Sequence, residues 1–151
     1  MVGIDALLNL DPAQDELLYD LQVGEDGDVV TEDQFETAVL VSLFSDRRAE
    51  PSQVPRPELR RGWVGDLQTP GDPIGSTLWL LEQSRLTGST ANAARDAAQV
   101  SLQWLVDDDF ATAVATRSVV GADSLLLFVD VSKPNSQTES FAVALWERTG
   151  R

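Results

Sequence analysis

Two pairs of arginines in the first half of the chain are the residues best suited to bind a charged partner. Arg47 and Arg48 follow an apolar run that ends at Asp46, and Arg60 and Arg61 precede a glycine-flanked tryptophan. The planar guanidinium group binds a carboxylate through two parallel hydrogen bonds and stays charged. Because the chain holds a single lysine, we predict that these arginines bind carboxylates of neighbouring subunits. The alternatives are solvent exposure and pairing with the acidic N-terminal third of the same chain.

Trp63 stands in a short loop, Gly62–Asp66, and is the next candidate for a partner contact. Tryptophan combines a large apolar area with one hydrogen-bond donor, and it is enriched both at interfaces and in cores. The loop lacks the lysine and the strand-to-helix context of a phosphate-binding turn. Trp79 lies within an apolar run and is predicted to belong to the core.

The residue types give little support to catalysis or metal binding. The chain contains no histidine and no cysteine, which removes the commonest general base and every thiolate ligand. Asp107–Asp109 and Glu25–Asp28 lack the alternating ligand spacing of a calcium loop, so we interpret them as solvated turns. We therefore predict no catalytic residue, no metal and no cofactor. The alternative is a carboxylate-dependent cell-wall glycosidase, although no motif singles out an acid and a nucleophile.

The charge is strongly negative and unevenly distributed. The 151 residues carry a formal net charge of −14, which disfavours nucleic acid and anionic membranes as partners. Residues 1–46 hold twelve acidic side chains and no basic one, whereas five of the eleven basic residues lie in residues 47–61. No run approaches the about 20 apolar residues of a membrane span, and the N-terminus lacks a basic leader. We expect synthesis in the host cytoplasm and pairing of the basic segment with acidic groups.

The periodicity predicts one α+β domain, residues 1–151, in which helices precede a sheet. An acidic N-terminal segment, residues 1–30, contains an alternating apolar run typical of a strand, followed by a turn. Helical spacing within residues 31–106 indicates three helices, and prolines make residues 49–59 an extended loop. The expected helices begin at a Thr31 cap, span about 76–85, and run from Ser89 or Thr90 to Asp107.

The last third of the chain changes to the two-residue period of strands. Residues 110–147 contain three such runs separated by short turns, which predicts a three-stranded antiparallel meander. In the last run Phe141, Val143 and Leu145 share one face. An apolar edge of this kind favours pairing with a partner strand. The expected strands are 110–120, 124–131 and 140–146.

Five motifs then occur in an order that resembles one known family. They are Gly27–Val30, Ser42–Ala49, Arg60–Asp66, Gly75–Leu81 and Leu102–Asp108. In wording and order they resemble the small baseplate wedge protein of Mu-like contractile-tail phages. That family is related to the short wedge subunits of other phage baseplates and of contractile secretion systems. Val64 departs from the pattern, in which a second aromatic residue is expected beside Trp63, and residues 50–59 look individual to this chain.

The resemblance implies a structural protein of the virion and not an enzyme. It implies that the first helix and the Arg47–Arg48 corner join helices of larger baseplate wedge proteins, and that the C-terminal sheet meets the sheath protein of the first ring. Central hub or tube proteins are further implied partners, with six copies of the chain per tail baseplate. An acidic regulator that binds a basic host protein is another class left open. The predicted partner-interface residues are Phe44, Asp46, Arg47, Arg48, Arg60, Arg61, Trp63, Asp66, Phe141, Val143 and Leu145.

Overall fold

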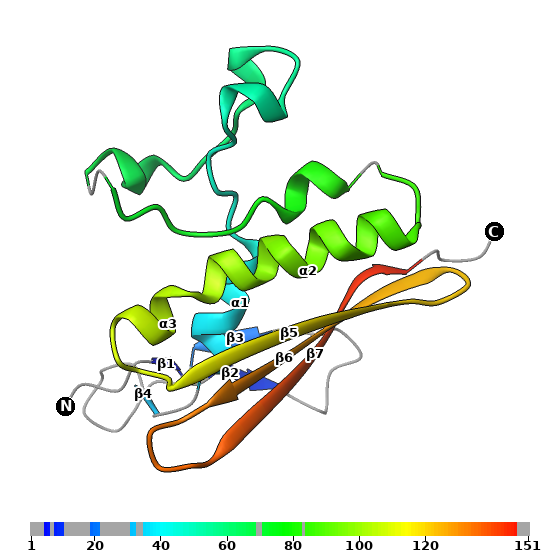
Figure 1. Cartoon of the computed structure of the whole chain (residues 1–151). Helices are drawn as coiled ribbons and strands as arrows, with labels where there is room; N and C mark the ends of the chain where they lie inside the picture. Colours follow the sequence, from blue (N-terminus) through cyan, green and yellow to red (C-terminus); the bar gives the residue numbers. More distant parts are fainter. Residues whose placement is uncertain are drawn as a thin grey trace. The chain divides into compact units, whose positions relative to one another are not determined.

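A three-stranded antiparallel sheet in the order β5-β6-β7 occupies the last third of the computed structural model (Figure 1). Its strands are β5 (Ala113–Val120), β6 (Ser124–Ser132) and β7 (Thr138–Glu147). Successive side chains of a strand point to opposite faces, and in the central strand β6 every second side chain is fully buried. The predicted meander is confirmed. The buried side chains of β6 are Leu125, Leu127, Val129 and Val131.

The long helix α2 (Gly88–Leu102) covers the inner face of this sheet and follows β5 (Figure 1). Its first turn is capped by Thr87, whose hydroxyl accepts a hydrogen bond from the Thr90 amide at 3.2 Å. Small side chains on the buried face allow the helix to lie close to the strands. A short helix, α3 (Trp104–Asp107), follows after Gln103, so the single helix predicted to end at Asp107 is found as two helices. The small buried residues are Ala91, Ala94, Ala98 and Ser101.

The structure describes residues 5–6, 8–10, 19–21, 31–32, 35–68, 71–82 and 84–147. Contacts divide the chain into two units, Met1–Leu40 and Val41–Arg151. In the N-terminal unit β1 (Asp5–Ala6) pairs with β4 (Thr31–Glu32), and β2 (Leu8–Leu10) pairs with β3 (Tyr19–Leu21). Helix α1 (Glu36–Phe44) begins in the N-terminal unit and ends in the C-terminal unit.

The N-terminal strand predicted around residues 17–23 is found as β3, and the turn and acidic cluster expected after it lie outside the described residues. The predicted Thr31 cap is wrong. Thr31 and Glu32 pair with Ala6 and Asp5 in a β-ladder, and helix α1 begins only at Glu36. A β-branched threonine fits a strand. Its backbone N–H and C=O groups pair within the β-ladder, so they do not take part in the first turn of a helix.

The helix predicted over about 76–85 is also wrong. The chain forms only one 3-10 turn there, η4 (Leu78–Leu81). Gly75 has a φ of +92°, and Ser76 forms a parallel bridge with Asp46, so the backbone before η4 is already committed to other hydrogen bonds. A helix cannot begin where those amides and carbonyls pair elsewhere.

Between α1 and α2 the chain leaves the body of the C-terminal unit as a segment that we call the arm, residues 50–74 (Figure 1, cyan to green). The loop expected over residues 49–59 is not simply extended. It contains the 3-10 turns η1 (Pro51–Gln53) and η2 (Pro57–Leu59), and η3 (Val64–Leu67) follows. Proline stands at the first position of η1 and of η2, where its fixed φ suits a helical turn. No helix among the described residues is long and apolar enough to cross a membrane.

Candidate functional site

The two ends of the arm are held to the end of α1 by backbone hydrogen bonds. The Ser76 amide donates to the Ser45 carbonyl, and the Arg47 amide donates to the Ser76 carbonyl, both at 2.9 Å. One step further out, the Ala49 amide donates to the Arg60 carbonyl at 2.9 Å. These bonds bring the Asp46–Arg48 corner and the second arginine pair together, although the two lie far apart in the sequence.

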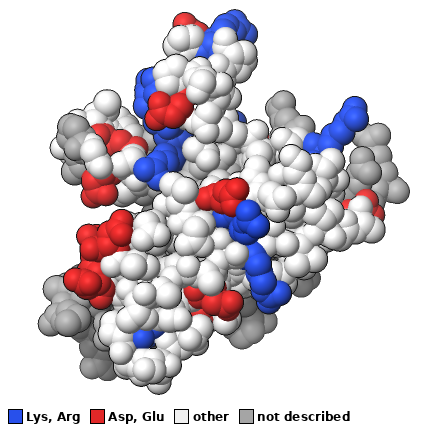
Figure 2. Space-filling view, viewed as in Figure 1, with Lys and Arg blue, Asp and Glu red and all other residues white. Residues whose placement is uncertain are grey.

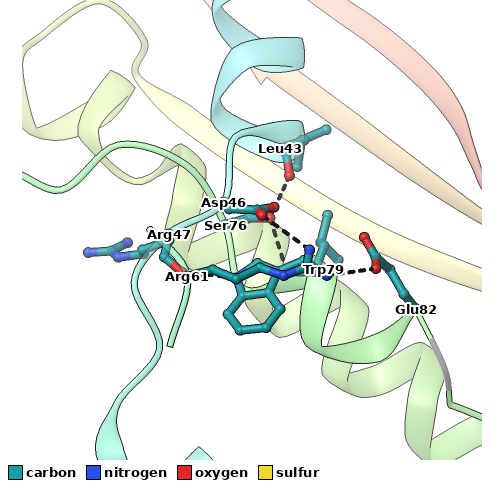
Figure 3. A network of polar contacts seen from close by, with 8 residues as sticks. Leu43, Asp46, Arg47, Arg61, Ser76, Trp79 and Glu82 are labelled. Carbon is teal, nitrogen blue, oxygen red and sulfur yellow. Dashed lines mark hydrogen bonds and ion pairs between the residues drawn. The ribbon is translucent and has the colours of Figure 1, made fainter. Parts of the chain in front are cut away.

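We call the region where the end of α1 bonds to Ser76 the junction. Ser76 lies buried within it. Its hydroxyl donates to the Leu43 carbonyl at 2.5 Å and accepts a hydrogen bond from the Leu78 amide at 3.1 Å (Figure 3). The residue is buried, so water cannot replace either bond. Ser76 therefore ties the last turn of α1 to the beginning of η4.

Substituting Ser76 with alanine is expected to lower the free energy of unfolding by about 1–2 kcal/mol, because two buried backbone groups lose their partner. Urea unfolding of the purified chain, followed by tryptophan fluorescence, measures this loss. The matched control is Ser84→Ala at an exposed serine, for which about 0.5 kcal/mol or less is expected. Equal effects of the two substitutions would contradict a structural role for the Ser76 hydroxyl.

Arg61 is the centre of a polar network on the outside of the junction (Figure 3). Its guanidinium group lies 3.2 Å from an Asp46 carboxylate oxygen and 3.5 Å from a Glu82 carboxylate oxygen. It also stacks over the Trp79 ring at 4.7 Å from the centroid, and the Trp79 indole donates to the Arg47 carbonyl at 2.9 Å. Arg61 reaches this place with a φ of +44°, which an L-residue adopts only when its surroundings hold it there.

Removing the Arg61 side chain is expected to cost about 1 kcal/mol of unfolding free energy or less. Both ion pairs and the stacked ring are partly exposed to solvent, where such interactions are screened. At high salt, the difference in unfolding free energy between the Arg61→Ala variant and the parent should become smaller, because salt screens the ion pairs. Arg56→Ala, at an exposed arginine of the arm, is the control. A loss of several kcal/mol would show instead that the network holds the arm in place.

The four arginines predicted to bind partner carboxylates therefore differ in the groups to which their side chains bond. Arg61 pairs within the chain, the alternative raised by the sequence, and Arg60 donates through Nε to the Ala49 carbonyl at 2.5 Å. Arg48 donates to the Arg61 carbonyl at 3.4 Å. The Arg47 guanidinium points away from the network in Figure 3, and it makes no hydrogen bond or ion pair with the part of the chain that the structure describes. Among these four arginines, Arg47 alone has a guanidinium group that makes no hydrogen bond or ion pair with the described residues.

Three other predicted interface residues lie beside this junction. Phe44, Asp46 and Leu145 line one hollow of about 260 Å³, together with Leu78 and Trp79. Phe44 is about half exposed, so the hollow has an apolar side open to solvent. Trp79 was assigned to the core from its apolar neighbours, but it is only half-buried and faces Arg61. Glu82, which pairs with Arg61, was not predicted as a site residue, and only its place one turn after Trp79 could have indicated it.

Phe141 and Val143 lie elsewhere, on the inner face of the sheet. They stand opposite Val129 and Leu127 of β6, two of the fully buried side chains, and they are themselves half-buried. Strand β7 pairs with β6 alone among the strands of the described sheet, and so it forms one edge of that sheet. A β-bulge next to Leu125 interrupts the ladder near Leu145.

Trp63 and Asp66 lie on the arm. Trp63 is 49% exposed and its ring lies directly against Gly65, while the Asp66 carboxylate accepts a hydrogen bond from the Ile74 amide at 3.1 Å. Asp66 thus ties the arm to itself, and Val64 and Leu67 stand 75% and 77% exposed beside the tryptophan. Figure 2 shows basic and acidic side chains interspersed over this face, so the basic segment predicted from composition is not a continuous positive surface.

The acidic run Asp107–Asp109 behaves as a turn. Asp107 accepts a hydrogen bond from the Gln103 side chain at 3.1 Å, and Asp109 has a φ of +62°. Within the described residues no group of three or more acidic side chains is arranged to hold a metal ion. The chemistry that the junction can perform is the binding of a carboxylate by Arg47 and of an apolar side chain beside Phe44.

Comparison with known proteins agrees with the motifs. The family model described as phage protein GP46 matches residues 35–138, which include α1, the arm, α2, β5 and β6. The chain is 39% identical over 99 residues to the "Baseplate protein gp46" of Escherichia phage Mu, covering 64% of this chain and 68% of that protein. It is 34% identical over 121 residues to the "Mu-like prophage FluMu protein gp46" of Haemophilus influenzae, covering 80% of this chain and 83% of that protein. The chain therefore belongs to the phage protein GP46 family, as its resemblance to the Mu-like baseplate proteins predicted.

Proposed function

We propose that this chain is a structural baseplate subunit of a contractile phage tail or tail-like particle. It joins larger wedge proteins and links the baseplate to the first ring of the sheath. The observation that carries the proposal is the match to a protein named as the baseplate protein of phage Mu, together with a family model that includes the arginine junction and strands β5 and β6. The role is mechanical, since its work is done by contacts and not by a reaction.

The contact with larger wedge proteins is assigned to the junction at the end of α1. Arg47 offers a charged group without a partner among the described residues, and Phe44 offers an exposed ring next to an apolar hollow. A buried bidentate arginine–carboxylate pair combined with an aromatic anchor is a common centre of a protein interface. The Trp63 region of the arm, with its exposed apolar side chains, is a second contact with a baseplate neighbour.

The contact with the sheath is assigned to the outer edge of β7. A partner strand that adds to this edge gains a full set of backbone hydrogen bonds, which suits a joint that must carry load. The ten residues of β7 provide room for such a strand. In this arrangement the sheet transmits movement of the sheath to the wedge through the junction of the arm.

The test is to purify particles from producing cells and to quantify this chain against the sheath and wedge proteins by mass spectrometry. We expect a constant ratio to both, and we expect cells that lack the chain to make no contractile tails. Restoring the chain from a plasmid should restore the tails. Particles that assemble normally and do not contain the chain would overturn the proposal.

A further inference from the structure

The arm places large apolar side chains in solvent and not in the core. None of its three 3-10 turns contains a buried residue. Even so, five of the ten large hydrophobic residues that are exposed in the described part of the chain lie on the arm. Single exposed apolar residues are normal, whereas several in one place mark an interaction site. The five residues are Leu59, Trp63, Val64, Leu67 and Ile74.

Four of these five lie in residues 62–68 and 71–74, a segment that we call the η3 lobe. In Figure 1 the lobe lies at the periphery of the C-terminal unit, away from the sheet. Val64 and Leu67 are more exposed than any other large hydrophobic residue of the described chain. The bond from the Ile74 amide to the Asp66 carboxylate, at 3.1 Å, joins the two ends of the lobe. The lobe therefore presents its apolar side chains on a closed loop.

The Trp63 ring is positioned by the backbone of its own loop. A Cβ atom at Gly65 would come within 2.0 Å of two carbons of this ring. Gly65 does not have a positive φ, so its backbone conformation would accept alanine, and it is the ring that requires glycine. A half-exposed ring that is already fixed loses little conformational entropy when a partner covers it. Trp63 is therefore suited to be the aromatic anchor of an interface.

The η3 lobe carries two carboxylates and no basic residue. Asp66 and Asp72 form no ion pair with the described residues. Oδ2 of Asp66 is buried, and among the buried side-chain nitrogen and oxygen atoms of the described residues it alone lacks a hydrogen-bond partner. A carboxylate oxygen without a donor destabilises the structure, and a donor supplied by another molecule relieves this. The lobe therefore favours a partner that brings a basic side chain.

Three arginines lie at the base of the lobe and do not neutralise its carboxylates. The guanidinium groups of Arg60 and Arg61 bond to groups outside the lobe. Arg48 packs against Gly62 and donates to the Arg61 carbonyl at 3.4 Å. Positive charge thus lies at the base, whereas both carboxylates follow Trp63 in the chain. A complementary surface is apolar where it meets the tryptophan and basic where it meets the carboxylates.

We infer that the η3 lobe docks into an apolar cleft of a neighbouring baseplate protein, with Trp63 as its anchor and a basic side chain of the cleft paired with Asp66 and Asp72. The inference rests on the proposed function, and it specifies the chemistry of the contact made by the arm. A cleft without the basic group would desolvate both carboxylates and leave them unpaired. The charge pair therefore selects the partner, and the apolar side chains supply most of the affinity.

The first test uses the full-length chain in producing cells, with a photo-activatable benzophenone amino acid at position 67. The control places the same group at Ser52, which is exposed on η1 of the same arm. We expect light to join position 67 to one baseplate component of the purified tails, within a segment that contains Arg or Lys. Position 52 should give at least about tenfold less of this product, because the contact belongs to the η3 lobe alone.

The second test addresses the anchor. Trp63→Ala is expected to reduce the recovery of the chain in tails at least about tenfold. Gly65→Ala should also reduce it, because the added Cβ displaces the ring although every apolar side chain of the lobe remains. Leu59→Ala, at an exposed apolar residue of the arm outside the lobe, should leave recovery unchanged. Unchanged circular dichroism and urea unfolding establish that the variants are folded.

The third test reverses a charge. Asp72→Lys is expected to reduce the cross-link at position 67 and the recovery in tails at least about tenfold, since a like-charge contact replaces the pair. Glu58→Lys, at an exposed acidic residue of the arm outside the lobe, should leave both unchanged. Changing the basic residue of the cross-linked partner to glutamate should restore the cross-link of the Asp72→Lys variant.

The outcomes separate this inference from the proposed function. If the chain is present in tails but position 67 gives no more product than position 52, the lobe is not an interface and the proposed function stands. Normal recovery of the Trp63→Ala or Asp72→Lys variant would also overturn the inference. The same holds for a cross-link to a second copy of this chain, or to a segment without Arg or Lys. If the chain is absent from particles, both the proposed function and the inference fail.

Discussion

Substituting Gly75 with alanine is expected to destabilise the C-terminal unit by about 3 kcal/mol or more. Gly75 has a φ of +92°, in a region that L-residues avoid, and a Cβ atom added there would overlap the Ser45 carbonyl oxygen. That carbonyl accepts the Ser76 amide bond that holds the returning end of the arm. The backbone must therefore move, and the junction around Arg47 moves with it.

Gly71 offers a matched control for this prediction. It has a similar φ of +99°, but nothing lies within 4 Å of the position that a Cβ atom would take. Gly71→Ala should therefore show the cost of the backbone conformation alone, about 1 kcal/mol. Urea unfolding of the two variants and the parent, followed by tryptophan fluorescence, gives the comparison. If both alanine variants lose the same stability, the close contact with Ser45 is not what requires glycine at position 75.

Leu127→Ala is expected to lower the free energy of unfolding by about 2–5 kcal/mol. Leu127 is completely buried in the central strand β6, on the face that α2 covers, and it stands opposite Ser118 of β5 and Val143 of β7. Alanine would remove apolar area from the core and leave a cavity that strands held on both sides cannot close.

The same sheet provides the control. Val119 of β5 is 45% exposed, so Val119→Ala removes side-chain atoms that are already in contact with water. We expect a loss of about 0.5 kcal/mol or less from that change. Thermal or urea unfolding of the purified chain distinguishes the two variants. Comparable losses would mean that the face of the sheet under α2 is not the core of the C-terminal unit.

Local patterns predicted the elements whose shape depends on nearby residues. The three strands of the sheet came from their two-residue period and from the turns between them, and the helical segment that the structure divides into α2 and α3 came from its alanine and leucine spacing. Elements that compete with distant partners were predicted wrongly. Thr31 pairs with Ala6, and Ser76 pairs with the end of α1, and neither partner can be recognised from the neighbouring sequence.

The arginines show the same division at the candidate site. Their number and their position around a glycine–tryptophan loop indicated a region that binds carboxylates. Their partners did not follow from that pattern. Asp46 and Arg61 are 15 residues apart, and Arg47 and Trp79 are 32 residues apart, so only folding brings each pair within bonding distance.

The sequence alone determined that the chain belongs to the phage protein GP46 family, that its sheet is an antiparallel meander and that residues 47–61 hold a concentration of basic charge. These properties depend on residue types and on their order along the chain. The tertiary structure decided that Arg60 and Arg61 bond within the chain, whereas the Arg47 guanidinium group makes no hydrogen bond or ion pair with the described residues. The physical reason is that a guanidinium group binds whichever acceptors the fold places within about 3 Å, and those acceptors come from distant segments.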